Sequence, residues 1–399
     1  MNKKSKTNWQ KNSTVFMWNS IFNWYQGFVS VWPLIWLRYM SFSQAMSIYS
    51  VSLLIGLVLE LPSGALADMI GRRETVLVGR LFAIASYITY FYARSFPMFL
   101  LANILYQLNW TMESGAQSAL LYDSLKENKQ EKKWYQHIES KTYMYCTMIM
   151  VLGCVVGGYA YQIQPHLPYA ICIVAAVISF GIAWFFEEPH IDSEKWSLPS
   201  YIRQNVEGVK HVVRFSAIRW ITLFTVAAGF VSYTGLWYMY EPRLAVEGFS
   251  PSILGYVVAG TYLARAVGIS LIPAFLKKFG ESKTLVLFVL LQSFGSALSI
   301  FSGKMWAISS VYLRKAMDGV RKPICDRLAN DHVDSKYRAT ALSAISLYTN
   351  LAVALAGPVI GWSVVKTDIR VTLALFSVIG IVLVLPVAVK LGKVLRRDA

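Results

Sequence analysis

Apolar stretches of membrane-spanning length recur along the whole chain, separated by short polar segments. An α-helix needs ~20 residues to cross the hydrocarbon core of a bilayer, and each stretch is close to that length. The weakest stretch, 305–327, carries five charged residues before its last two positions. The pattern predicts an all-α membrane protein with twelve transmembrane helices, at 14–37, 44–63, 75–93, 97–121, 142–162, 168–187, 217–240, 252–275, 284–302, 305–327, 340–364 and 371–391.

Lys and Arg indicate the orientation, because cytoplasmic loops of membrane proteins collect them. With the amino terminus inside, most of the 38 basic residues lie on the cytosolic side. Both termini and the segment 188–216 are then cytosolic, and we expect a multi-pass protein of the cytoplasmic (inner) membrane. Six basic residues are expected outside, namely Arg38, Arg94, Arg243, Lys304, Lys366 and Arg370, and five within spans, namely Arg265, Arg314, Lys315, Arg321 and Lys322.

Composition points the same way. The chain has 399 residues, of which 55% are hydrophobic and only 15% are charged, which is too apolar for an ordinary soluble protein of this size. The net charge of +16 comes mainly from basic residues in the predicted loops. These residues do not form a basic face on a soluble domain. We therefore expect membrane lipid as a partner and no nucleic acid.

Residue types that support catalysis or cofactor binding form no recognisable site. The four cysteines lack CxxC spacing, and the five histidines lack HExxH spacing. The sequence also has no P-loop, the motif that would indicate ATP-driven transport. We expect no cofactor, no metal and no enzymatic activity. The cysteines are expected to pack in or at the edge of spans, and are Cys146, Cys154, Cys172 and Cys325.

The longest polar interval divides the predicted spans into two groups of six. We expect an N-terminal bundle at 1–187, a cytoplasmic linker at 188–216 and a C-terminal bundle at 217–399. The second bundle repeats the first weakly, which favours two pseudo-symmetric halves with a substrate site at the midplane between them. The matching segments are Gly71 to Thr75 with Gly280 to Thr284, and Leu121 to Leu125 with Ile324 to Leu328.

A short hinge, 60–74, joins the second and third predicted spans. Gly64 lies one helical turn before Ala67, so this face allows another helix to approach closely, and Gly71 suits a tight turn. The hinge resembles the signature between the second and third helices of the major facilitator superfamily. The residues that carry this resemblance are Gly64, Leu66, Ala67, Asp68, Gly71, Arg72 and Arg73.

Two further segments are similar to bacterial members of that superfamily, around Asp123 and around Arg338. The resemblance implies that Asp68 meets the positive end of a helix in the opposite half in one conformation only. Such a contact biases a two-state equilibrium, because it contributes to one state and not the other. The alternative is a solvated cytoplasmic loop. The residues of the expected conformational latch are Gly64, Asp68, Gly71, Arg72, Arg73, Asp123 and Arg338.

Polar stripes follow the helices that line the central cavity in the resembled fold, which are the first, fourth, seventh and tenth. Stripes facing lipid would leave polar groups unsatisfied, so we expect them to face protein or water. Hydrogen bonds between helices are the alternative role for any single residue. The expected cavity residues are Asn19, Asn23, Gln26, Asn103, Gln107, Trp110, Gln117, Tyr233, Trp237, Arg314 and Asp318.

The tenth predicted span places several ionisable groups near the membrane midplane, where they are costly and tend to pair. Asp318 is one helical turn from both Arg314 and Lys322, and three residues from Arg321. The surplus positive charge could attract an anionic substrate group. Alternatively, Arg321 and Lys322 reach the cytosol.

Coupling to protons needs a titratable group in the pathway. Glu113 is the leading candidate, and Glu60 and Asp318 are the others. The resembled bacterial pattern often has acids near Gln117 and Ser118, so facilitated diffusion stays open.

The expected function is secondary active transport of a small organic solute by alternating access, with proton-coupled efflux (proton antiport) of an amphipathic compound or drug favoured. A degenerate antiporter-type glycine motif, Gly153, Gly157 and Gly158, adds slight support. Uptake or exchange of an anionic metabolite is one alternative, and a non-transporting membrane sensor is another. The protein is expected to work as a monomer, with a small-molecule substrate and a coupling proton as partners.

Overall fold

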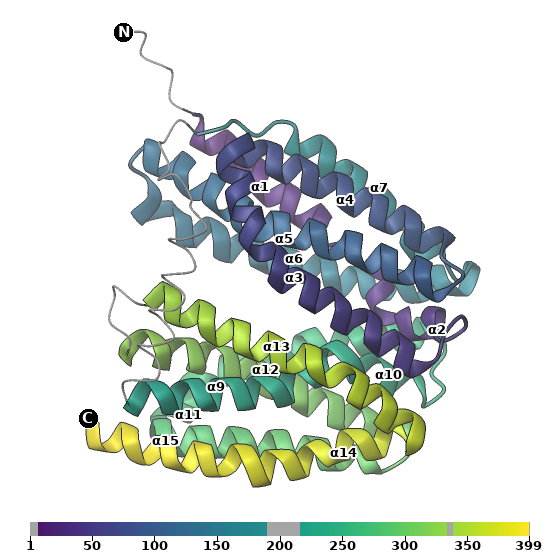
Figure 1. The fold of residues 1–399 in the computed structure, drawn as a ribbon, viewed down its shortest axis with the longest axis vertical. Helices are drawn as coiled ribbons and strands as arrows, with labels where there is room; N and C mark the ends of the chain where they lie inside the picture. The colour runs from purple at the N-terminus through teal and green to yellow at the C-terminus, as the bar shows by residue number, and fades with distance from the viewer. Residues whose placement is uncertain (1–6, 190–215, 333–337, 399) are drawn as a thin grey trace. The chain divides into compact units, whose positions relative to one another are not determined.

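The structure, a computed structural model, describes residues 7–189, 216–332 and 338–398. The side chains at 60–68, 114, 216–217, 338–344 and 397–398 are outside this description. Among the described residues all regular structure is helical and no strand occurs, which confirms the all-α fold class (Figure 1). Contacts divide the described residues into two units. Unit 1 comprises residues up to 39 and 54–189, and unit 2 comprises 40–53 and the residues from 216 onward.

Unit 1 is built from long helices with short connections. Polar residues of α1, α4 and α5 contact one another in one part of the unit. Aromatic residues pack together in another part. Tyr90 and Tyr169 stack in parallel with ring centres 4.9 Å apart, and Trp36 donates its indole N–H to the Tyr169 hydroxyl at 2.9 Å. The elements are α1 (Trp9–Asn23), η1 (Gly27–Ser30), α2 (Trp32–Trp36), α3 (Phe42–Ile70), α4 (Arg72–Tyr92), α5 (Phe96–Glu127), α6 (Glu131–Ile163) and α7 (Leu167–Ala183).

Unit 2 contains the remaining helices together with the first turns of α3. Ser50 of α3 is 3.3 Å from the Tyr238 hydroxyl, which donates to the Val353 carbonyl. The sequence pattern groups 40–53 with the N-terminal bundle, whereas the contacts group it with unit 2. The elements are α9 (Ser216–Thr234), η2 (Gly235–Met239), α10 (Tyr240–Ala245), α11 (Pro251–Ala297), η3 (Leu298–Ile300), α12 (Lys304–His332), α13 (Arg338–Lys366), α14 (Ile369–Ile379), η4 (Gly380–Val384) and α15 (Leu385–Asp398).

The first predicted span, 14–37, is not one continuous helix. It ends as α1 at Asn23 and resumes as α2, where Pro33 suits a helix start because its missing N–H would have no helical partner there. Between them, η1 lies against α6, and a Cβ at Gly157 would overlap the Gly27 carbonyl. Ser30 also donates to the Cys154 carbonyl at 2.8 Å. The glycines of α6 thus make room for the broken span.

Two turns in the different units have the same local geometry. Gly71 and Gly280 both have positive φ, 101° and 68°, a conformation that residues with a Cβ rarely adopt. Thr75 donates its hydroxyl to the Gly71 carbonyl at 2.7 Å, and Thr284 does the same to Gly280. Because Gly280 departs from helical φ and ψ inside α11, that element covers two predicted spans with a turn between them. The weak sequence repeat therefore corresponds to a repeated turn structure.

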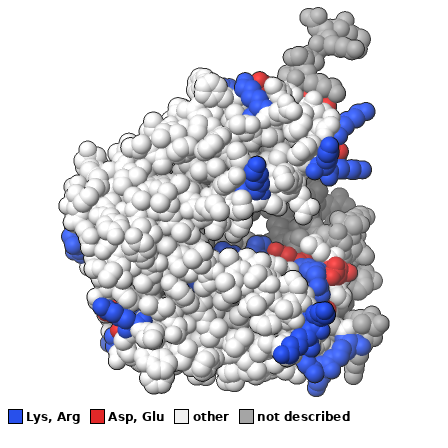
Figure 2. Space-filling view, turned by 180° about the vertical axis from the view of Figure 1, so that it is seen from behind, with Lys and Arg blue, Asp and Glu red and all other residues white. Residues whose placement is uncertain are grey.

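Seven helical segments of the described chain are long and apolar enough to cross a membrane. The remaining predicted spans coincide with shorter or more polar helices, α1, α5, α7 and α12, so the number of spans stays a prediction. Figure 2 shows a broad uncharged surface on one face, with most Lys and Arg gathered toward its margins. Large exposed apolar side chains, such as Ile163 and Leu263, fit a surface that faces lipid. The fold is that of a multi-pass membrane protein.

Candidate functional site

Arg80 of α4 is fully buried inside unit 1 and forms an ion pair with Glu113 of α5. Arg80 Nη2 is 3.1 Å from Glu113 Oε1, and Arg80 Nη1 is 3.2 Å from Oε2. A charge taken out of water needs a partner and further hydrogen bonds, since desolvation costs several kcal/mol per ion. The pair therefore places two opposite charges in the interior of unit 1, where each compensates the other. The sequence-based set of intramembrane cations omits Arg80, although it lies inside the predicted span 75–93.

Side-chain amides complete the hydrogen bonding of the Arg80 guanidinium. Asn19 Oδ1 accepts from Nε at 3.2 Å and from Nη2 at 2.8 Å. Asn109 Oδ1 accepts from Nη1 at 3.0 Å, and Gln117 Oε1 accepts from Nη2 at 2.8 Å. The guanidinium thus has amide acceptors in addition to the carboxylate of Glu113.

Helical spacing explains how these residues meet. Asn109, Glu113 and Gln117 follow each other at steps of four along α5, so they share one face. Asn19 and Asn23 do the same on α1, and Asn23 donates its amide to Glu113. The expected stripes on the first and fourth spans therefore face each other, with Arg80 between them.

Neighbouring groups hold the amides in place. Asn19 donates to the Ser179 carbonyl at 2.7 Å, and Gln117 donates to the Ser20 hydroxyl at 2.8 Å. These bonds orient both amide oxygens toward Arg80. Asn19 and Gln117 therefore do both: they form hydrogen bonds between helices, and they contact the ion pair.

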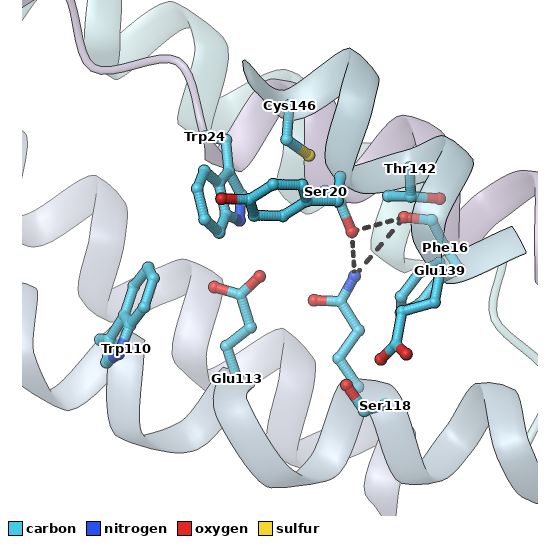
Figure 3. A pocket seen from close by; sticks show the side chains of 11 residues that line it. Phe16, Ser20, Trp24, Trp110, Glu113, Ser118, Glu139, Thr142 and Cys146 are labelled. Atoms are coloured by element: carbon cyan, nitrogen blue, oxygen red, sulfur yellow. Dashed lines mark hydrogen bonds between the residues drawn. The ribbon is translucent and has the colours of Figure 1, made fainter. Parts of the chain in front are cut away.

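Next to the ion pair, residues of α1, α5 and α6 and the adjoining Trp24 line a partly open cavity of about 180 Å³ (Figure 3). Glu113 rises from α5 beside Trp110 and points toward the side of the cavity on which Trp24 lies. The Trp24 ring centre is 5.7 Å from that of Trp110 and 6.0 Å from that of Tyr143. The lining residues are Phe16, Ser20, Trp24, Trp110, Glu113, Gln117, Ser118, Glu139, Thr142, Tyr143 and Cys146.

The cavity is lined by two carboxylates and, among described residues, by no Lys or Arg. Glu139 of α6 accepts from the Tyr135 hydroxyl at 3.0 Å. The Thr142 hydroxyl is buried without a hydrogen-bond partner in the described part of the chain. Sequence reasoning missed Glu139, Thr142 and Tyr143, because 139 precedes the predicted fifth span and the expected polar stripes do not include that helix.

Three of the expected cavity residues in unit 1 lie away from this lining. Asn103 donates to the Tyr90 hydroxyl at 2.7 Å, within the aromatic cluster. Gln26 precedes η1 at the break in the first span, and Gln107 of α5 is half-buried. Asn19 and Asn23 contact the ion pair, and Trp110 and Gln117 line the cavity directly.

In unit 2, α12 carries a second buried cluster. Arg314 is fully buried, donates from Nη2 to the Val231 carbonyl at 2.8 Å, and lies 5.1 Å from the Tyr240 ring centre and 5.7 Å from that of Phe376. Its Nε and Nη1 have no hydrogen-bond partner among described residues. Interaction with aromatic rings thus takes the place of a carboxylate.

Of the three cations that helical spacing places within reach of Asp318, Arg321 forms an ion pair with it at 3.3 Å. Arg314 forms none with it in the described part of the chain. Arg265 of α11 pairs with Asp318 at 3.6 Å from the neighbouring helix, and spacing along one helix does not reveal such a partner.

The two cations at 321 and 322 have different surroundings. Arg321 is buried, with its guanidinium 4.4 Å from the Tyr233 ring centre. Lys322 is exposed and pairs with Asp326 at 2.8 Å. Trp237 is 41% exposed, although Tyr233 lies one helical turn before it in the sequence. The two aromatic residues therefore have different environments.

The expected latch residues are only partly described. Arg72 and Asp123 form an ion pair between α4 and α5, and Arg73 pairs with Glu74 at 2.9 Å. The Glu188 carboxylate accepts from the backbone N–H groups of Arg72 and Arg73 at 2.8 and 2.7 Å, which caps the start of α4. The side chains of Asp68, Arg338 and the coupling candidate Glu60, and the environment of Gly64, lie outside the described residues.

Comparison with known proteins places this fold. The sequence pattern that defines the Major Facilitator Superfamily matches residues 222–398. The chain is 22% identical to the uncharacterized MFS-type transporter YxaM of Bacillus subtilis (strain 168), over 83% of this chain and 82% of that protein. It is 20% identical to the class B tetracycline resistance protein of Escherichia coli, over 74% and 73% respectively. The crystal structure of the nucleoside transporter NupG superposes with a TM-score of 0.77 at 12% identity, over 96% of this chain and 98% of that one. The C-terminal part of the chain thus matches the Major Facilitator Superfamily, and most of the chain is similar in sequence and in fold to transporters of that superfamily.

Proposed function

We propose that this protein is a secondary active transporter that exports a small amphipathic organic compound across the cytoplasmic membrane in exchange for protons. The observation that carries the proposal is the position of Glu113. Its carboxylate faces an aromatic cavity on one side and holds the buried Arg80 on the other. A proton and a substrate group could therefore act on the same side chain.

Protonation of Glu113 changes the interactions of Arg80. It removes the negative charge, so the ion pair is lost while the amides of Asn19, Asn109 and Gln117 continue to accept from the guanidinium. The amide shell limits the cost of that step, because each guanidinium nitrogen keeps an amide acceptor. If the ion pair contributes different free energies to the two conformations, its loss shifts the equilibrium between them by that difference.

The cytosolic latch is proposed to respond to that bias. The described part of it is the ion pair between Arg72 and Asp123, at the start of α4 and near the end of α5. Arg80 and Glu113 join the same two helices farther along, two to three turns away. A shift of α4 against α5 would therefore strain both ion pairs together. Asp68 is proposed as the third member.

The names of the relatives leave the direction of transport open. One of them is a tetracycline resistance protein, and another solved structure is that of a nucleoside transporter. At these levels of identity neither defines the substrate of this chain. The export direction rests on the aromatic, acidic cavity and on the partial resemblance to antiporters.

Uptake or exchange of an anionic metabolite is a second candidate. It is favoured by three guanidinium groups, those of Arg265, Arg314 and Arg321, of which two pair with the carboxylate of Asp318. An anionic substrate group would satisfy the free nitrogen atoms of Arg314.

Everted membrane vesicles test the proposal. Fluorescent amphipathic probes of positive, neutral and negative charge are offered while an imposed proton gradient is raised and then collapsed with nigericin. We expect gradient-dependent accumulation of at least one probe, lost in Glu113→Gln and retained in the surface control Asp331→Asn. Accumulation of anionic probes alone would favour the second candidate, and binding without accumulation would favour a sensor.

A further inference from the structure

We infer that the cavity of unit 1 binds a cationic group, an aromatic or alkyl ammonium, of the compound that the protein transports. This inference rests on the proposed function and deepens it, because it names the chemical class of the substrate. It is drawn from the rings, the charges and the free hydroxyl of the cavity.

Three aromatic rings form a continuous wall of the cavity. Trp24 is inclined by 54° to Trp110 and by 77° to Tyr143, and at ring-centre distances of 5.7 and 6.0 Å these rings are in tilted or edge-to-face contact. A ligand would pack against this wall. Trp and Tyr faces attract cations, and sets of such rings are the usual means of binding quaternary ammonium groups.

The charges of the cavity add to this preference. Glu113 and Glu139 contribute two negative charges, and the nearby Arg80 balances one of them. Glu139 has a tyrosine hydroxyl as its partner and no described ion pair. The surroundings therefore carry one excess negative charge, which a ligand cation can neutralise. An anion would meet carboxylates that repel it, which provides selectivity as well as affinity.

This acidic cavity contrasts with the rest of the protein. The chain carries a net charge of +16, and its basic residues outnumber acidic ones by 38 to 22. Charged lining residues that are all acidic would not be expected from that composition. The free Thr142 hydroxyl adds a polar group that can accept a hydrogen bond from a primary or secondary ammonium.

The buried cluster of α12 is the competing site, and it suits the opposite charge. Arg314 is fully buried, and the rings of Tyr240 and Phe376 pack beside its guanidinium. A ligand anion would first have to displace these packed groups. The open, acidic cavity is therefore the better supported site.

Binding of three small probes to the purified full-length protein tests the inference by isothermal titration calorimetry. The probes are phenyltrimethylammonium, its uncharged isostere tert-butylbenzene, and benzenesulfonate. The first two differ only in the central atom, so their comparison isolates the charge. We expect the ammonium to bind about tenfold more tightly than the isostere.

Two variants locate the site. Glu139→Gln should abolish most of the preference for the ammonium, and Trp110→Leu should weaken both binding ligands. Glu139 and Trp110 are partly exposed, so melting temperatures should stay close to the parent value. Asp331→Asn, on the surface of α12, should change neither. If Glu139→Gln fails to fold, Glu139→Asp, which keeps the charge, must retain the preference.

The inference is overturned by absence of ammonium binding at millimolar concentration, by equal affinity for the isostere, or by preference for benzenesulfonate. These outcomes are separate from failure of the proposed function. Loss of charge preference with intact gradient-driven transport contradicts only the inference. Charge-selective binding without transport contradicts only the proposed function.

Discussion

Arg80 and Glu113 are joined through both carboxylate oxygens, at 3.1 and 3.2 Å, although they lie on different helices and 33 positions apart in the sequence. Removing one member leaves the other buried without its counter-charge, which is more costly than removing both. Arg80→Met should therefore lower the melting temperature more than the double variant Arg80→Met/Glu113→Gln. We expect an interaction energy of about 0.5–3 kcal/mol in a double-mutant cycle.

Thermal unfolding of the purified protein, followed by intrinsic fluorescence, measures that cycle. Asn19→Ala in the same assay reports on the amide shell alone. Strict additivity of the two substitutions would mean that the residues are not coupled in solution.

Asp123→Asn should slow transport per folded protein. The ion pair of Asp123 with Arg72 is largely buried, so the substitution should also lower the melting temperature. Its proposed role is to differ between conformations. Asp68→Asn should have the same effect on transport. Transport rates in vesicles, normalised to protein, are compared with melting temperatures, and unchanged rates would reduce both acids to ordinary loop residues.

Glu247 should make stability depend on pH. Burial raises its pKa, but the Gly303 N–H group, Arg243 and Arg370 together outweigh burial and leave the pKa below its ordinary value. A lowered pKa stabilises the fold above the ordinary value of about 4.3, and this stabilisation is lost as the pH falls through the lower value.

Glu247→Gln tests this dependence. At pH 7 it should cost about 1–3 kcal/mol, since it removes the negative charge that pairs with the buried Arg243, whose Nη1 lies 2.5 Å from the carboxylate. The difference in melting temperature between variant and parent should shrink below about pH 4. A difference that stays constant down to the acid limit would exclude ionised Glu247 as its source.

Gly157→Ala should destabilise unit 1. Its new Cβ would overlap the Gly27 carbonyl, and overpacking of this kind costs about 1–3 kcal/mol. Gly181→Ala is the matched control, because a Cβ there has nothing within 4 Å. The control should be neutral or slightly stabilising, as expected for Ala in a helix. Equal melting temperatures of the two variants would show that η1 does not touch α6.

The predicted orientation can be checked by labelling single cysteines in intact cells. All four native cysteines are buried, so they should react little with a membrane-impermeant thiol reagent and can be left in place when new cysteines are introduced. Ser200→Cys should react only after the cells are permeabilised, and Lys304→Cys, between the predicted ninth and tenth spans, should react from outside. Labelling of position 200 in intact cells would contradict the topology.

Much of the fold follows from local pattern. The apolar stretches predict the helices, and Gly71 and Gly280 mark turns because few other residues tolerate positive φ. The stripes on α1 and α5 are recognisable from steps of three and four. Each of these signals lies within one helix, where spacing determines which side chains share a face.

Contacts between helices are much harder to predict. Arg80 escapes sequence reasoning because the acid that neutralises it lies on the next helix, and Asp318 has an unexpected partner for the same reason. The break at Gly27 depends on glycines of α6 more than 120 positions later, which no local pattern contains. Glu139 precedes the predicted span, and only the packed structure brings it to the same cavity as Glu113.

The π-helical segment η2, Gly235–Met239, changes the angular register of everything that follows it. An α-helix turns by about 100° per residue, so one additional residue in a turn rotates the next segment by about that angle. Trp237 is consequently exposed, while the ring of Tyr240 is turned inward beneath Arg314. Gly235 makes this possible, since a Cβ there would collide with both Tyr240 and Arg314. Deletion of one residue from this turn would rotate the side chains about the helix axis. The Tyr240 ring would then lie away from Arg314.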